Sequence, residues 1–282
     1  MQERNSQSSE ILAALGLRPL SARSVVASVL LGTHPPRLSS AAVVELCGRF
    51  GIAGGTTRVA LSRMVAAGEL AAEDGHYRLV GEGLLSRQRT QDDALDPPAR
   101  PWQGGWRMAV VVSPGRAAAE RIELRRAFAD ARFAQWREGV WLRPDNLGTP
   151  GDGGCAPDEG GASRHGQPAS VLAEGPVRWL AAEPDGDPRA LAGELWDLPA
   201  WMARGGALLG AAPAEPGDLV ASAPEWAAAV FAAAAATLRH LRTDPLLPAP
   251  LVPAGWPADR LRVRYAAYLD AIQALVRHLS AG

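Results

Sequence analysis

Apolar residues recur at helical spacing in three short segments near the N-terminus, which are residues 20–32, 39–50 and 55–67. Spacings of three and four residues predict amphipathic helices, and a glycine at or beside each C-terminal end is typical of a helix stop. The stretch that follows is predicted to form two short strands around Asp74-Gly75, a strong signal for a two-residue hairpin turn. Three helices and a hairpin predict a winged helix-turn-helix domain over residues 1–90.

The middle of the chain has a different pattern. Strands are predicted at 106–113 and 176–184, a helix at 115–133 with Ile122, Leu124 and Phe128 near its apolar face, and two strands within 134–146 that turn at Glu138-Gly139. The order β-α-β-β-(α)-β predicts a ferredoxin-like α/β domain over residues 100–187. Residues 91–101 are predicted to be a Pro-rich hinge, and the Gly- and Pro-rich segment 148–168 a disordered loop.

The last third of the chain is predicted to be helical. One or two helices follow residue 188, and longer helices are expected at 224–243 and 258–280, on either side of an irregular Pro-rich crossing at 244–257. A helical C-terminal domain is therefore expected over residues 188–282. Together the three parts predict an α+β chain.

The third predicted helix carries the strongest functional signal. One side bears Thr57, Ala60, Leu61 and Met64 and is expected to pack inward. The other side carries polar donors, as a helix in the major groove of DNA requires. The residues predicted to bind DNA are Thr56, Thr57, Arg58, Ser62 and Arg63 on the helix and His76, Tyr77 and Arg78 on the hairpin. An ordinary solvated helix face and a winged helix that docks proteins remain as alternatives.

Charge is distributed unevenly, although the formal net charge is only −1. Residues 1–90 hold 10 Arg against 7 acidic residues, whereas residues 144–220 hold 4 against 12, and every basic residue is Arg. No apolar run is long enough to span a membrane, and the N-terminus lacks the features of a secretion signal. The two cysteines, Cys47 and Cys155, form no CxxC pair, so a cytoplasmic protein is expected.

Sequence motifs for catalysis are missing from the chain. No phosphate-binding loop, nucleophile elbow, zinc-protease or dinucleotide fingerprint occurs, and the five histidines are scattered. The first strand of the middle domain also lacks the Asp that a metal-dependent nucleic-acid-processing enzyme needs. We therefore expect no enzyme activity, no metal and no cofactor, and such a processing enzyme is the weaker alternative.

Several segments taken in order resemble the PaaX family of bacterial transcriptional repressors. The similarity begins near SARSVVASVLLG, continues through TTRVALSRMVAAGEL and is strongest in PWQGGWRMAVVV, FAQWREGVWLRPDNL and RTDPLLPAPLVPAGWP. The resemblance implies a dimer with a winged helix, a ferredoxin-like middle domain and a helical C-terminal domain. It also implies that residues 54–68 are the recognition helix.

The family resemblance further implies a repressor of catabolic genes. Such a dimer would bind double-stranded operator DNA and be released by an acyl-CoA effector such as phenylacetyl-CoA, as members that control phenylacetate catabolism are. Arg239 and Arg107 are the candidate effector-binding residues. The chain departs from the family in its long loop at 148–168, and in an Ala run at 232–236 where a His is expected.

Overall fold

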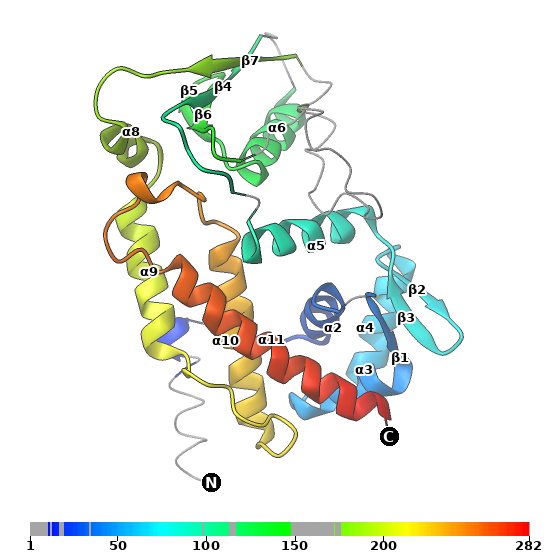
Figure 1. Ribbon diagram of the computed structural model, residues 1–282. Coiled ribbons are helices and arrows are strands. Elements are labelled where there is room, and N and C mark those ends of the chain that lie inside the picture. The colour runs from blue at the N-terminus through cyan, green and yellow to red at the C-terminus, as the bar shows by residue number, and fades with distance from the viewer. Residues whose placement is uncertain are drawn as a thin grey trace, which may run out of the picture. The chain divides into compact units, whose positions relative to one another are not determined.

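The computed structural model is mixed α and β, with helices and antiparallel sheets (Figure 1). It describes residues 20–33, 35–97, 99–112, 117–147 and 176–281, together with residues 11, 13–16 and 172. The α+β class predicted from the sequence is therefore confirmed. The segment 148–168, predicted to be a loop, lies outside the described residues.

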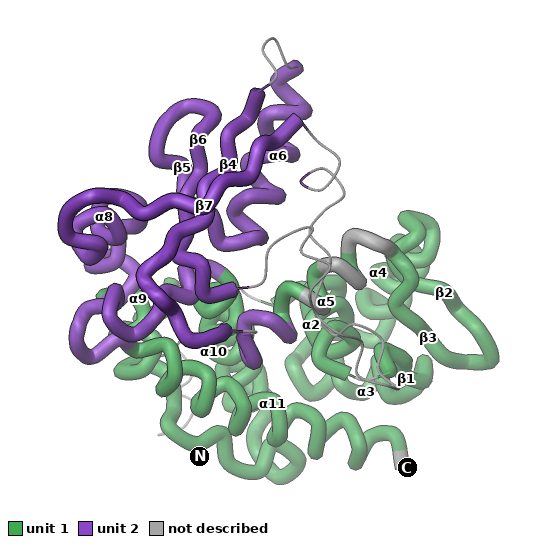
Figure 2. The backbone as a smooth tube through the Cα atoms, turned by 45° about the horizontal axis from the view of Figure 1, so that its top comes forward, with its two compact units in different colours: residues 1–91, 203–242, 257–282 green, residues 92–202, 243–256 purple. Residues whose placement is uncertain are grey.

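The chain divides into two compact units, which are coloured separately in Figure 2. Unit 1 consists of residues 1–91, 203–242 and 257–282, and unit 2 of residues 92–202 and 243–256. Unit 1 thus joins the front of the chain to helices near its C-terminus. The three domains that the sequence predicts, over residues 1–90, 100–187 and 188–282, stay a prediction.

The front of unit 1 contains short elements whose ends are set by local capping. They are α2 (Ala22–Leu31), β1 (Arg37–Ser39), α3 (Ser40–Arg49), α4 (Gly54–Ala66), β2 (Leu70–Glu73) and β3 (His76–Leu79). Ser21 caps α2 through reciprocal hydrogen bonds with Ser24, and the Ser39 hydroxyl accepts from the Ala42 amide at the start of α3. The three predicted helices are confirmed, with ends within one or two residues.

The sheet of unit 1 has the strand order β1-β3-β2 and is antiparallel throughout. Asp74 and Gly75 join β2 to β3, and both have positive φ, at 49° and 73°. Two successive left-handed residues are typical of a type I′ turn, whose twist matches that of the flanking strands. The hairpin prediction is confirmed. Strand β1 was not predicted, because three residues are too few to show an alternating pattern.

Two long helices from the C-terminal third complete the core of unit 1. α10 (Pro224–Leu241) and α11 (Ala258–Ala281) contact each other, and both contact α3. The rings of Phe50 and Phe231 lie with centroids 4.8 Å apart. The Arg49 guanidinium donates to the Leu219 carbonyl oxygen at 2.9 Å. These contacts explain why the helices predicted at 224–243 and 258–280 share a core with the N-terminal segment.

Helix α5 (Glu82–Leu95) replaces part of the hinge predicted over residues 91–101. Ala94 is fully buried, and Gln91 is buried with its amide donating to the Tyr265 hydroxyl at 3.3 Å. The hinge prediction is therefore wrong for residues 91–95. The polar composition of this segment indicated an exposed linker. A polar side chain can also be buried when it has a hydrogen-bond partner, so the composition alone does not distinguish a linker from a packed helix.

Unit 2 is built on an antiparallel sheet with the strand order β5-β6-β4-β7. Its elements include β4 (Trp106–Val111), α6 (Ala118–Asp130), β5 (Ala134–Arg137), β6 (Val140–Pro144), β7 (Val177–Ala182), α8 (Pro188–Leu195), α9 (Leu198–Ala211), which continues into unit 1, and the 3-10 helix η1 (Ala249–Leu251). The strands and the helix predicted for the middle of the chain are confirmed, including the turn at Glu138-Gly139.

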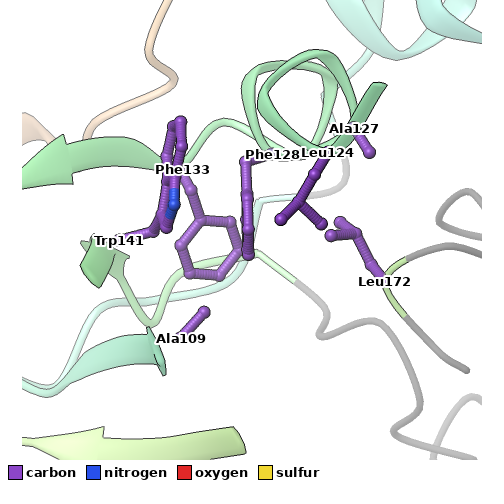
Figure 3. Close-up of a cluster of buried hydrophobic side chains, with 7 residues drawn as sticks. All are labelled: Ala109, Leu124, Ala127, Phe128, Phe133, Trp141 and Leu172. Atoms are coloured by element: carbon purple, nitrogen blue, oxygen red, sulfur yellow. The ribbon is translucent and has the colours of Figure 1, made fainter. Parts of the chain in front are cut away.

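One face of this sheet packs against α6, and Phe128 lies at the centre of the contact (Figure 3). Its ring stacks on Trp141 with centroids 4.6 Å apart and meets Phe133 edge-on at 5.7 Å. Leu124 is buried beside it, as predicted. Ile122 is 67% exposed, so its predicted place on the apolar face is wrong. Helical periodicity places Ala127, rather than Ile122, beside Leu124 and Phe128.

The opposite face of the sheet is covered by α8 and η1. Trp106 and Leu142 are buried there among Ala192 of α8 and Leu251 of η1. Both faces of the sheet are therefore packed against other elements of unit 2. Alternate residues of β4 and β6 serve the two sides, as strand geometry requires.

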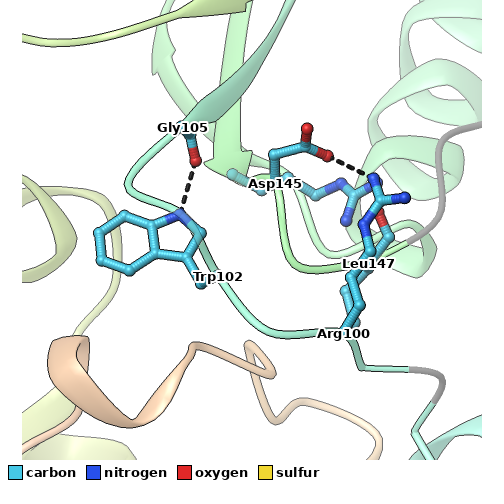
Figure 4. Close-up of polar contacts among 6 residues, drawn as sticks. Arg100, Trp102, Gly105, Asp145 and Leu147 are labelled. Carbon is cyan, nitrogen blue, oxygen red and sulfur yellow. Dashed lines mark hydrogen bonds and ion pairs between the residues drawn. The ribbon is translucent and has the colours of Figure 1, made fainter.

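Polar contacts fasten the segment before β4 to the turn after β6 (Figure 4). Arg100 forms an ion pair of 2.8 Å with Asp145, and the Asp145 amide donates to the Gly105 carbonyl oxygen at 3.0 Å. The Trp102 indole donates to the same Gly105 carbonyl at 2.6 Å. These bonds hold the segment before β4 in place, although it forms neither a helix nor a strand.

Candidate nucleic-acid interface

Helix α4 has one buried and one exposed side, as its residue spacing predicts. Thr57, Leu61 and Met64 are buried at 0–1% exposure and face the core of unit 1. The exposed residues of the other side are Thr56, Arg58, Val59, Ser62 and Arg63. No hydrogen bond or ion pair joins Arg58 or Arg63 to another side chain in the part of the chain that the structure describes. Both guanidinium groups therefore remain available to a ligand.

Thr57 is corrected from a DNA-binding residue to a core residue. Its side chain is fully buried, and its hydroxyl donates to the Ala53 carbonyl oxygen at 3.3 Å. It also hydrogen-bonds Cys47, whose thiol pKa is raised by burial and lowered to a lesser extent by this bond. A side chain enclosed in this way cannot reach a DNA base. Thr56, one position earlier, is exposed.

The N-terminal end of α4 carries no capping side chain. Ala53 occupies the N-cap, and no acidic residue lies in the first turn. The amides of the first turn consequently have no side-chain acceptor at the cap, and the helix dipole is not offset by a local carboxylate. Gly55 adds an exposed stretch of backbone there, with open space where a Cβ would lie. The amides, Thr56 and Arg58 form a donor-rich end suited to an anion.

A surface hollow of about 460 Å³ lies beside this end of α4. Residues from α3, α4 and β3 line it, namely Ser40, Ala41, Val44, Glu45, Arg58, Leu61 and Tyr77. The fold thus brings Arg58 and Tyr77 together, although they are 19 positions apart in the sequence. A cation and an aromatic ring on one edge are a common pair at nucleic-acid surfaces.

The hairpin presents its predicted residues on two faces rather than one. His76 and Arg78 lie on one face of β3 and Tyr77 on the other, because successive strand residues alternate. The His76 ring Nδ1 lies 2.8 Å from the Asp74 carbonyl oxygen, so Nδ1 carries a proton that it donates. Arg78 forms an exposed ion pair of 3.0 Å with Glu73. Only Tyr77 therefore shares a surface with Arg58.

Arg37 is a candidate site residue that the sequence analysis missed. It lies on β1 directly opposite Arg78 and is exposed. Its guanidinium group has no hydrogen-bond or ion-pair partner among the described residues. An Arg following Pro35-Pro36 was a signal, but it fell at a predicted helix end and was not assigned to a strand.

The two candidate effector residues lie in different units of the protein. Arg239 is exposed in the last turn of α10, in unit 1. Arg107 is half-buried in β4 of unit 2, opposite Arg143 of β6 and Ala181 of β7. The locations of Arg239 and Arg107 do not show whether either binds a ligand, so their assignment as effector-binding residues stays a prediction.

The described residues contain no group of three or more His, Cys, Asp or Glu side chains that could hold a metal ion. No helix in the described ranges has the length and apolar character needed to cross a membrane. The exposed side of α4 and the adjacent hairpin therefore form the candidate interface that the geometry favours.

Comparison with protein families finds matches over two separate regions of the chain. Residues 21–83, which include α4 and the hairpin, match the family described as PaaX-like protein. Residues 99–150, which include β4 to β6, match the PaaX protein central Cas2-like domain. The chain belongs to the PaaX family. The membership predicted from the ordered motifs is therefore confirmed.

A solved structure is similar to nearly the whole chain. It is that of an uncharacterized protein from Mycobacterium tuberculosis, which is 40% identical, with a TM-score of 0.68. The match covers 92% of this chain and 98% of the other. No curated protein matches the chain. PaaX membership indicates a regulator rather than an enzyme.

Proposed function

We propose that this PaaX-family protein is a transcriptional repressor that binds operator DNA through α4. The observation that carries the proposal is the exposed side of α4, where Arg58 and Arg63 have no partner among the described residues. Arg can donate two hydrogen bonds to guanine O6 and N7 in the major groove. The uncapped N-terminal end of α4 and Thr56 would contact backbone phosphates and set the position of the helix.

In this proposal the segment α2–β3 acts as a winged helix-turn-helix domain. α3 and α4 form the helix pair, α4 is the recognition helix, and the β2–β3 hairpin is the wing. The strand order of unit 2 supports a ferredoxin-like middle domain, since a β-α-β-β-(α)-β chain forms a sheet of this order. Two copies of the chain would bind the two halves of a near-palindromic operator, about one or more helical turns apart.

Membership of the PaaX family supports a proposal for the regulated genes and the effector. We propose control of catabolic genes such as those for phenylacetate, with release by an acyl-CoA such as phenylacetyl-CoA in the cytoplasm. Arg239 and Arg107 are the candidate contacts for its phosphate groups. In this proposal the protein has a conformation that binds DNA and one that does not. The effector releases DNA only if it binds the second conformation more tightly than the first.

The experiment is fluorescence anisotropy with labelled DNA from upstream of the protein's own gene, across a salt series. Saturable binding that weakens steeply with salt is expected. A panel of aryl and alkyl acyl-CoA thioesters is then added, with free coenzyme A as the control. Relief by one thioester supports the effector, and relief by none removes the effector while keeping the repressor. Absence of sequence-specific binding would contradict DNA recognition and favour a protein-docking role.

A further inference from the structure

Val59 occupies the centre of the exposed side of α4, where a polar residue is the usual choice. At 100° per residue, Gly55, Thr56, Ser62 and Arg63 all lie within about 60° of it around the helix axis. Thr57 and Leu61, both buried, lie about 160° away. Val59 itself is 52% exposed. The middle of the candidate interface is therefore a β-branched apolar side chain with the polar residues Thr56, Ser62 and Arg63 beside it.

The surroundings of Val59 favour DNA over another protein as its partner. Arg63 and Arg58 lie on either side of it and have no partner among the described residues, and α4 carries no acidic residue. A cationic border around one apolar side chain complements a polyanion that offers a local apolar group. In the major groove that group is the C5-methyl of thymine.

We propose that Val59 packs against the C5-methyl group of a thymine in the operator and so helps to determine its sequence. The inference rests on the proposed function, because it requires α4 to lie in the major groove. Arg63 and Ser62, one turn further along the same side, would then contact base pairs next to that thymine.

The test begins with a duplex that the protein selects from a random-sequence library of unmethylated DNA, in which thymine is the only source of the methyl group. Each thymine of the selected site is replaced in turn by deoxyuridine, which removes only that methyl. Affinity is measured for the wild type, for Val59→Ala and for Val65→Ala. Val65 is a matched control, since it is the same residue type on the same helix, 36% exposed and towards its C-terminal end.

At one thymine per half-site, deoxyuridine should weaken wild-type binding about fourfold, the equivalent of one buried methyl-sized group. The same replacement should not weaken Val59→Ala further, whereas Val65→Ala should keep the full effect. Melting temperatures of both variants should equal that of the wild type, because both side chains are partly or largely exposed.

Two results would overturn the inference, and they are distinguishable. In the first, a sequence is selected, but deoxyuridine at no thymine lowers affinity in a way that depends on Val59. DNA recognition then stands and the methyl contact is refuted. Failure to select any sequence, together with absence of salt-dependent binding, overturns the proposed function as well.

Discussion

Arg37 lies directly opposite Arg78 in the β1–β3 pairing, so two positive side chains share one face of the three-stranded sheet of unit 1. Hydrogen bonds from the Leu79 amide to the Pro36 carbonyl and from the Ser40 amide to the Gly75 carbonyl join residue pairs one and three positions along the ladder from the Arg pair, and hydrogen-bonded pairs alternate. The pair therefore occupies a non-hydrogen-bonded position, where cross-strand side chains approach most closely. Like charges at such a position are unfavourable, and a bound phosphate would relieve the repulsion.

Arg37→Ala should weaken binding to all DNA sequences about equally. The slope of log affinity against log salt should become shallower by about 1, as expected when one phosphate contact is lost. Glu73→Gln should act in the opposite direction, because it frees Arg78 from its ion pair and removes a negative charge. Anisotropy across a salt series measures both. Loss of affinity in Glu73→Gln would show that the wing does not approach phosphate.

Thr56→Val and Thr57→Val should separate an interface residue from a core residue. Thr57→Val removes a buried hydrogen bond to Ala53, so the free energy of unfolding should fall by about 1 kcal/mol while DNA affinity is unchanged. Thr56→Val should weaken DNA binding and leave stability within about 0.5 kcal/mol. Urea denaturation and anisotropy provide the two readouts. Weaker DNA binding by a stably folded Thr57→Val would contradict its placement in the core.

Gly55→Ala should stabilise the protein and weaken DNA binding. Gly55 is helical, and open space lies where the new Cβ would be, so about 0.5–1 kcal/mol of stability is expected. A methyl group there would hold phosphate away from the amides. Gly54→Ala is the control. Its new Cβ would lie only 3.3 Å from the Val44 side chain, so this substitution should stabilise the protein less. Unchanged affinity in Gly55→Ala would place the DNA elsewhere.

The thiol of Cys47 should make stability fall at alkaline pH. Burial raises the pKa of this thiol above its ordinary value of 9.0, although a hydrogen bond with Thr57 lowers it to a smaller extent. The unfolded chain would lose the proton first, so this contribution is full below about pH 9 and lost as pH rises through the folded-state pKa. Comparing urea unfolding of the wild type with Cys47→Ala across this range isolates the effect. An equal decline in both proteins would refute it.

The sequence predicted the local elements well because their signals are local. The spacing of Thr57, Leu61 and Met64 predicts which side of α4 is buried, and Asp74-Gly75 predicts the turn. The sequence could not show that α10 and α11 share a core with α3, because which elements pack together depends on contacts between distant residues. Similarly, three-residue β1 has no readable pattern, so Arg37 escaped notice.

The candidate site was predicted in composition but not in arrangement. Treating His76, Tyr77 and Arg78 as one group overlooked the alternation of strand residues, which separates Tyr77 from the other two. The sequence assigned no role to Val59. Its exposure beside two unpaired Arg side chains becomes meaningful only when the surrounding surface is known.

The most direct test of the account measures how Arg58→Ala and Arg63→Ala bind a sequence-specific duplex, with Arg277→Ala, an exposed residue of α11, as the control. Each α4 variant should lose about 1–3 kcal/mol of binding free energy if its Arg contacts a base, and should melt like the wild type. Arg277→Ala should bind normally. Full affinity in both α4 variants would contradict the claim that α4 recognises DNA.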